Sequence, residues 1–285
     1  TYYGDGTSVV ITNSNITGNG SAVAVGYDEN DTSYAEFGEG NTLEDGVSII
    51  GNGTYVGVDA LNTPVDWQGG AQPNVIEGGL VDDDLAGGEG SDTFVDSPGV
   101  DDYDGEGGID TVQFGADAGE LRIVDGQWVI WKDGEVADTL TGIERVEIGS
   151  DVYLLVDQLA DGGFTSVQAA IDAAAGGETI LVAAGENPYV ESADFTASPT
   201  AEHAQGLPGT NAGNNPLGLL INKSVTLQGV DSAGNLVNAA SEDAPVIQSE
   251  RQSGWGTHFF VTADDVAING LTLEATPTAW NGSPL

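Results

Sequence analysis

Residues 78–113 divide into four consecutive units of nine residues, and this phase limits the possible folds more than any other feature of the 285-residue chain. The sixth position of each unit is aspartate, at Asp83, Asp92, Asp101 and Asp110. The eighth position is bulky and apolar or aromatic, at Leu85, Phe94, Tyr103 and Val112. A flexible, acidic, glycine-rich linker has no reason to keep both positions in phase through four units. The pattern therefore predicts a repeated structural unit.

The units resemble the G-G-x-G-x-D-x-U-x repeats of the RTX family, the haemolysin-type calcium-binding repeats of secreted proteins. The resemblance implies that each unit is a metal-binding turn followed by a short strand, and that two units complete one coil of a parallel β-roll. Units two apart would then stack, with the first and third aspartates on one side and the second and fourth on the other. Two features depart from the pattern: Val81 replaces a glycine, and Asp96-Ser97 opens the third unit.

Calcium suits this composition because it binds about six to eight oxygen atoms, from carboxylates and backbone carbonyls, in flexible geometry. Glycine helps because it tolerates the positive φ angles that direct several carbonyls inward. We expect Ca²⁺ to be bound by the four aspartates and by backbone carbonyls of Gly79, Val81, Gly88, Gly90, Gly99, Gly105 and Gly108. About two or three ions would fit so few turns. The alternative is a solvated acidic loop that binds no metal.

The charge of the chain excludes one class of function and favours another. Asp and Glu number 46 against 5 Lys and Arg, which gives a formal net charge of −41. Nucleic-acid binding is excluded because phosphate contacts need Lys and Arg, and an anionic membrane surface is disfavoured. Bound calcium would offset part of the repulsion, so folding should depend on the metal. Adaptation to a saline habitat is the alternative source of the acidity. Cysteine is absent, so no disulfide can stabilise an extracellular fold.

Residues 1–70 and 71–160 are both predicted to be β-structured. The first segment contains short apolar runs at 8–12, 22–25, 47–50 and 54–58, separated by Asn-Gly and Gly turns. Such spacing favours coils of a parallel β-helix, at the C-terminal end of a solenoid. The second segment holds the nine-residue units and a flank in which Asp-Gly pairs at 125–126 and 133–134 predict hairpin turns. We expect antiparallel strands that follow the roll and close its open end.

Residues 161–285 begin with one helical pattern, in which Phe164, Val167, Ile171 and Ala174 fall on one face. This predicts a short capping helix near 164–175, ended by Gly176-Gly177. Short strands are predicted at 179–182, 219–221, 224–227, 245–247, 259–261 and 266–273. The order resembles the start of a pectin-lyase-like right-handed parallel β-helix, a family in which such a helix caps the solenoid. The whole chain is thus expected to be all-β, with right-handed parallel β-helix segments flanking a calcium-binding parallel β-roll, as part of a longer repetitive protein.

Two kinds of function are compatible with this organisation. The first is a secreted, calcium-stabilised structural protein of the cell surface or extracellular matrix, such as a fibre, surface-layer or adhesin subunit. Its partners would be copies of itself, in a fibre or surface array, with a polysaccharide as a second candidate partner, and with no nucleic acid and no membrane insertion. The RTX resemblance implies type I secretion, with folding at extracellular calcium concentrations.

The alternative is a polysaccharide lyase or C5-epimerase, or a calcium-dependent glycan-binding module. No catalytic residue is predicted outright. The candidates are confined to a cluster of Arg251, His258, Asp264 and Asp265. The other interpretation of His258 is that it packs beside a strand or faces solvent, and carboxylates are too abundant here for their pairing to indicate catalysis.

Overall fold

A computed structural model describes residues 64–71, 73–158, 163–191, 218–238, 240–249 and 259–275, together with short strands between residues 8 and 57. The fold is nearly all-β, with largely parallel sheets, as predicted. Within the described ranges it has a single α-helix, α1 (Val167–Ala173), inside the range predicted for the cap. None of the helices described is long and apolar enough to span a membrane. The chain forms two compact units, Thr1–Val152 with Asp161–Gly163, and Tyr153–Ala160 with Phe164–Leu285.

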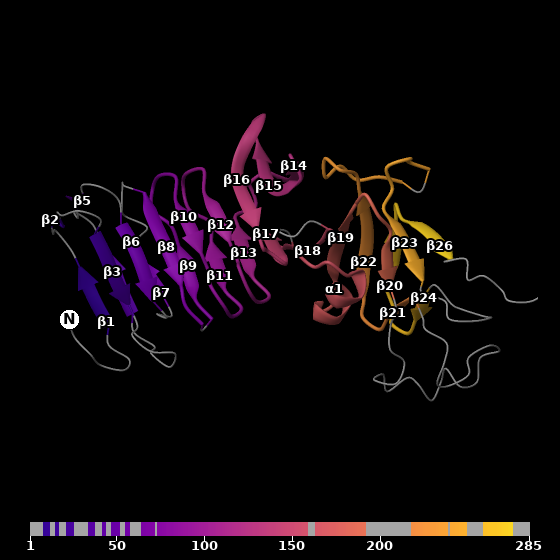
Figure 1. Cartoon of the computed structure of the whole chain (residues 1–285), viewed down its shortest axis with the longest axis horizontal. Helices are drawn as coiled ribbons and strands as arrows, with labels where there is room; N and C mark the ends of the chain where they lie inside the picture. The colour runs from indigo at the N-terminus through magenta and orange to yellow at the C-terminus, as the bar shows by residue number, and fades with distance from the viewer. Residues whose placement is uncertain are drawn as a thin grey trace, which may run out of the picture. The chain divides into compact units, whose positions relative to one another are not determined.

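The first unit is a stack of parallel strands on two faces (Figure 1, indigo to magenta). One face follows the order β1 (Ser8–Ile11), β4 (Tyr34–Phe37), β7 (Tyr55–Gly57), β9 (Val75–Glu77), β11 (Thr93–Val95), β13 (Thr111–Phe114) and β17 (Arg145–Ile148). The other follows β3 (Ser21–Val25), β6 (Val47–Gly51), β8 (Val65–Gly69), β10 (Asp84–Ala86), β12 (Asp102–Asp104) and β16 (Glu135–Thr141). A short parallel pair joins β2 (Asn15–Ile16) and β5 (Thr42–Leu43).

The eighth residue of each nine-residue unit forms the core of this stack. On one face Trp67, Leu85, Tyr103 and Leu140 are in register on neighbouring strands. On the other face the residues in register are Ile76, Phe94, Val112 and Val146. All are buried, and the Phe94 and Tyr103 rings of the two faces meet edge to face at 5.6 Å between centroids. Strands of only three residues are thus held in place by a continuous apolar stack. We therefore expect each unit to need its neighbours in order to fold.

An antiparallel excursion interrupts the stack after β13. Strands β14 (Glu120–Val124) and β15 (Gln127–Lys132) pair with each other, and β15 pairs with β16. Both predicted turns are present, with positive φ at Asp125-Gly126 and Asp133-Gly134. The antiparallel strands were predicted, but they do not end the parallel stacking. Strand β16 returns beside β12, and β17 lies beside β13, so the roll gains a further coil beyond the four units.

The second unit has three parallel ladders (Figure 1, red to yellow). The first ladder contains β18 (Asp151–Val156), β19 (Glu178–Ala183), β22 (Val225–Val230) and β25 (Ala267–Asn269). The second contains β20 (Tyr189–Glu191), β23 (Val246–Ser249) and β26 (Thr272–Ala275). The third contains β21 (Leu219–Ile221) and β24 (Phe259–Val261). From β19 on, successive strands join the three ladders in turn, so the chain winds as a β-helix.

Helix α1 packs onto this unit by the face that the sequence predicted. Val167, Ile171 and Ala174 are buried in its core, and Phe164 packs against the same cluster while partly exposed. The Ser166 side chain accepts a hydrogen bond from the Ala169 backbone, as an N-cap residue does. The carboxylate of Glu191 accepts a second bond, at 2.7 Å, from the Val167 backbone N–H.

Candidate metal centre

The aspartates at the sixth position stack in two columns, because Asp92, Asp101 and Asp110 each accept a hydrogen bond from the backbone N–H of the residue eighteen positions before it. In the first column, the backbone N–H of Asp92 donates to Asp110 Oδ1 at 2.7 Å. In the second, the N–H of Asp83 donates to Asp101 Oδ1 at 2.9 Å. The structure thus pairs the aspartates of units two apart, with all four side chains buried. Each carboxylate caps the turn before it and has a second oxygen left for other contacts.

Each column continues past the nine-residue units by a carboxylate that the sequence analysis missed. The backbone N–H of Asp110 donates to Glu144 Oε2 at 2.8 Å, and that of Asp101 donates to Asp138 Oδ1 at 3.0 Å. We call Asp92, Asp110 and Glu144 the Asp92 column, and Asp83, Asp101 and Asp138 the Asp101 column. The β14–β15 excursion shifts the last two residues out of the nine-residue phase.

A local signal for these two residues exists in the sequence. The segment Asp138-Thr-Leu140 repeats the order of Asp92-Thr-Phe94, an acidic residue two positions before a core residue. Glu144-Arg-Val146 has the same order. A search for this three-residue pattern, without the nine-residue period, would have found both carboxylates.

The second carboxylate oxygen distinguishes the two columns. In the Asp101 column, Asp83 Oδ2 accepts a hydrogen bond from the Gly79 backbone N–H. Asp101 Oδ2 accepts from the Ser97 hydroxyl at 2.8 Å and from the Tyr103 hydroxyl at 3.2 Å. In the Asp92 column, the Oδ2 atoms of Asp92 and Asp110 are buried and have no hydrogen-bond partner among the residues that the structure describes. A buried carboxylate oxygen without a donor is unfavourable unless a cation neutralises it.

Burial raises the pKa of five carboxyl groups in the columns, those of Asp92, Asp101, Asp110, Asp138 and Glu144, since the charged form is taken out of water. It raises the pKa of Asp92 from 3.8 to about 7, and that of Asp110 to about 6. The pKa of Glu144 and that of Asp138 are each raised to about 7, again by desolvation first. Charged neighbours in the stack add to the effect, as Asp110 does for Asp92. Without a cation, the stack therefore resists full ionisation near neutral pH.

Glycines leave room beside the carboxylates that have no donor. A Cβ on Gly87 would lie 2.5 Å from Asp92 Oδ2, and one on Gly105 would lie 2.7 Å from Asp110 Oδ2. Any side chain at these positions would fill the space in front of the oxygen. Gly108 has a φ of +155°, and its Cβ would overlap the Gly90 carbonyl of the turn below. These residues must be glycine for the turns to stack at this distance.

Several of the predicted carbonyl ligands lie between the stacked turns. The carbonyl of Gly88 accepts the Gly107 N–H at 2.9 Å, and the carbonyl of Gly90 lies against Gly108. In the Asp101 column the Val81 carbonyl lies against Gly99. Within the described residues, no group of three or more His, Cys, Asp or Glu side chains is placed to hold a metal ion. A metal in the columns would therefore need backbone carbonyls to complete its ligands, which hard cations such as calcium accept.

Two of the four candidate catalytic residues lie within the described part of the chain. Arg251 and His258 lie outside the described residues. Asp264 and Asp265 are exposed in the turn before β25, where the Asp264 carbonyl accepts a hydrogen bond from Ser224 at 2.7 Å and Asp265 has a φ of 55°.

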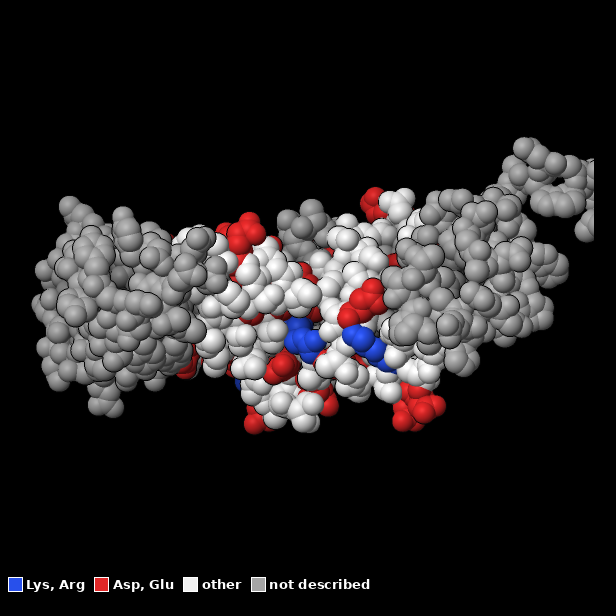
Figure 2. Space-filling model, turned by 90° about the horizontal axis from the view of Figure 1, so that it is seen from below, with Lys and Arg blue, Asp and Glu red and all other residues white. Residues whose placement is uncertain are grey.

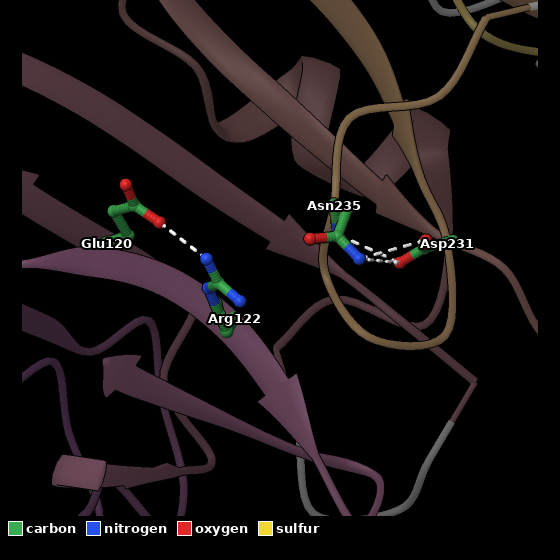
Figure 3. Close-up of polar contacts among 4 residues, drawn as sticks. All are labelled: Glu120, Arg122, Asp231 and Asn235. Atoms are coloured by element: carbon green, nitrogen blue, oxygen red, sulfur yellow. Dashed lines mark hydrogen bonds and ion pairs between the residues drawn. The ribbon is translucent and has the colours of Figure 1, made fainter. Parts of the chain in front are cut away.

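Other polar side chains on the surface contact residues that are close to them in the sequence. On the face shown in Figure 2, acidic side chains outnumber the basic ones among the described residues. Glu120 and Arg122 form an exposed ion pair at 2.9 Å, and Asn235 donates to both oxygens of Asp231 in a tight turn (Figure 3). Desolvation acts against ionisation of Asp231, but hydrogen bonds from Asn235 and Ala233 lower its pKa overall. These contacts stabilise a strand and a turn, and neither forms a binding site.

Comparison with known proteins adds no relative: no family model, no curated protein and no solved structure matches the chain. The resemblance to RTX repeats therefore rests on the nine-residue units and on the stacked, buried aspartates that they form. Both belong to the first unit of the chain.

Proposed function

We propose that this chain is a calcium-stabilised structural protein of the cell surface or extracellular matrix, in which the roll folds when calcium binds outside the cell. The observation that carries the proposal is the pair of buried oxygens, Asp92 Oδ2 and Asp110 Oδ2, that face glycine-lined space without a hydrogen-bond donor in the described structure. Calcium bound there would supply the positive charge that these carboxylates lack.

The charge of the chain supports the same proposal. A net charge of −41 opposes a compact state, and the buried carboxylates concentrate that repulsion in the stack. A chain of this kind would remain unfolded at the low calcium concentration of a cytosol and fold at about millimolar calcium, because metal affinity is then folding free energy. This behaviour suits export before folding, as type I secretion requires.

We expect this chain to bind further copies of itself. Parallel ladders offer backbone donors and acceptors at their edges, and an edge of matching register on another copy can pair with them. A fibre or a surface array would be the product. The described structure gives no observation that favours a polysaccharide-modifying enzyme over this scaffold.

The proposal is tested by far-UV circular dichroism and electron microscopy across a calcium titration, with reversal by EGTA. We expect β-structure to appear near millimolar calcium, filaments or sheets to follow, and both to be lost on chelation. The Asp92→Asn/Asp110→Asn variant should lose the response, while Asp117→Asn, which removes one exposed charge, should keep it. A chain that is folded and monomeric in EGTA, and unchanged by calcium, contradicts the proposal.

A further inference from the structure

We infer that only one of the two columns takes the cation: the Asp92 column binds calcium, and the Asp101 column is closed by the protein's own donor groups. This inference rests on the proposed calcium binding and specifies where it occurs. It departs from the expectation that all four aspartates of the units are equivalent ligands.

The Asp101 column already has donors where a metal would bind. The Ser97 hydroxyl donates to Asp101 Oδ2 at 2.8 Å, and the Tyr103 hydroxyl reaches the same oxygen at 3.2 Å. The other three units have Leu, Phe or Val in place of Tyr103, so this hydroxyl is particular to the third unit. Asp101 Oδ2 is thus saturated without a metal.

The same serine occupies the space between the turns of the first and third units. A Cβ on Gly78 would overlap both Ser97 Oγ and Asp83 Oδ2, which places the hydroxyl beside the first unit's carboxylate as well. Asp83 Oδ2 also accepts the Gly79 backbone N–H. The third unit begins with Asp96, whereas the other three units begin with glycine, so the space beside the carboxylate that Gly87 and Gly105 leave open in the Asp92 column faces a residue with a side chain in the Asp101 column.

A protein cation acts on this column too. Burial raises the pKa of Asp138 and of Asp96, and in both cases the positive charge of Lys132 opposes that effect. The Asp101 column therefore has hydroxyl donors and a nearby ammonium group.

The Asp92 column has the opposite character. Two of its carboxylates have a buried oxygen without a donor in the described structure, and glycine at positions 87 and 105 leaves space in front of each. Both oxygens lie in one stack, since Asp92 N–H binds Asp110 Oδ1 directly. The geometry points to cation binding along this side of the roll alone.

The test is equilibrium dialysis of the full chain against radioactive calcium, with calcium alone as the probe, for two variants. Asp110→Asn removes a carboxylate from the open column, and Ser97→Ala/Tyr103→Phe removes the two hydroxyls that saturate Asp101 Oδ2. We expect Asp110→Asn to bind fewer ions than the wild type. We expect Ser97→Ala/Tyr103→Phe to bind about one ion more per chain, because Asp101 then has a free oxygen like those of Asp92 and Asp110. Ser150→Ala, which removes an exposed hydroxyl, is the matched control and should not change the number.

The outcomes separate this inference from the proposed function. Wild-type chain that binds no calcium contradicts the proposed function itself. Wild-type chain that binds calcium, together with a hydroxyl-deleted variant whose ion number is unchanged or lower, overturns only the one-sided assignment. Circular dichroism at saturating calcium shows whether each variant has kept its β-structure. If Asp110→Asn does not fold, the gain of an ion in Ser97→Ala/Tyr103→Phe decides the question alone.

Discussion

The buried carboxylates make a definite prediction about pH, because their effect on stability should change sign when calcium is bound. Without metal, burial raises the pKa of Asp92 in the folded chain to about 7, from 3.8. A carboxyl group whose pKa is raised in the folded state does not lower the stability of the fold well below pH 4, because it is then protonated in both the folded and the unfolded state. Above that, the unfolded chain ionises first, so stability falls from about pH 4 and levels off above about pH 7.

The size of this fall follows from the shift. A difference of about three pKa units corresponds to about 4 kcal/mol at about 1.4 kcal/mol per unit. The rise in the pKa of Asp110 to about 6 corresponds to about 3 kcal/mol. Because the two groups are neighbours in one stack and titrate together, we take the larger single value. About 1 kcal/mol of it is already lost at pH 4.5, because the unfolded group has a pKa of 3.8, so we expect a loss of about 3 kcal/mol between pH 4.5 and pH 7.5. With calcium bound the ligands must be ionised, so stability should instead rise with pH.

Because the metal-free chain is expected to be unfolded near neutral pH, the series in EGTA uses urea unfolding at pH 4.5 and 6.0 and the folded fraction without urea at pH 7.5. A full urea series at the three pH values is measured in saturating calcium, and all are followed by the fluorescence of the buried Trp67 and Trp128. The net negative charge also lowers stability at high pH, so variants must isolate the buried groups. In EGTA, Asp92→Asn should raise the free energy of unfolding by about 1 kcal/mol at pH 4.5 and by about 3 kcal/mol at pH 6.0, and it should increase the folded fraction at pH 7.5. Asp117→Asn, an exposed match, should change the free energy of unfolding by less than about 0.5 kcal/mol. Stability in EGTA that is flat or rises from pH 4.5 to 7.5 would refute the reasoning.

Three further predictions concern the stack and the cap, each measured by urea unfolding in saturating calcium. Gly108→Ala should destabilise the fold by about 3 kcal/mol or more, because its Cβ would overlap the Gly90 carbonyl. The control Gly134→Ala, with positive φ but open space around it, should cost only about 1 kcal/mol. Equal costs would contradict the close stacking of the turns. Glu191→Gln should cost about 1–2 kcal/mol, because the charged cap on α1 becomes neutral, and an unchanged midpoint would show that the cap is not needed. Phe94→Ala should cost about 3–5 kcal/mol from loss of a fully buried ring, and a cost below about 1 kcal/mol would argue against the continuous core.

Much of the fold follows from local sequence, because each element carries its own signal. The eighth residues of the units are core residues in the structure, and the helix near 164–175 buries the face that its period predicted. The Asp-Gly turns formed where expected, since two successive positive φ angles suit those residues. Such features depend on neighbours within one unit or one hairpin.

The parts that sequence reasoning missed depend on contacts between distant units. The role of Asp138 and Glu144 was hidden because the β14–β15 excursion breaks the nine-residue period before them. The difference between the columns was hidden as well. It arises where the Ser97 and Tyr103 hydroxyls converge on Asp101, and a pattern of residue types records no hydrogen bonds.

The central claim is that the buried Asp92 column binds calcium, and calorimetric titration of calcium into the metal-free chain tests it most directly. The account predicts binding by the wild type and by Asp117→Asn, and loss of that binding in Asp92→Asn/Asp110→Asn. Equal heats and equal affinity in all three proteins would contradict it.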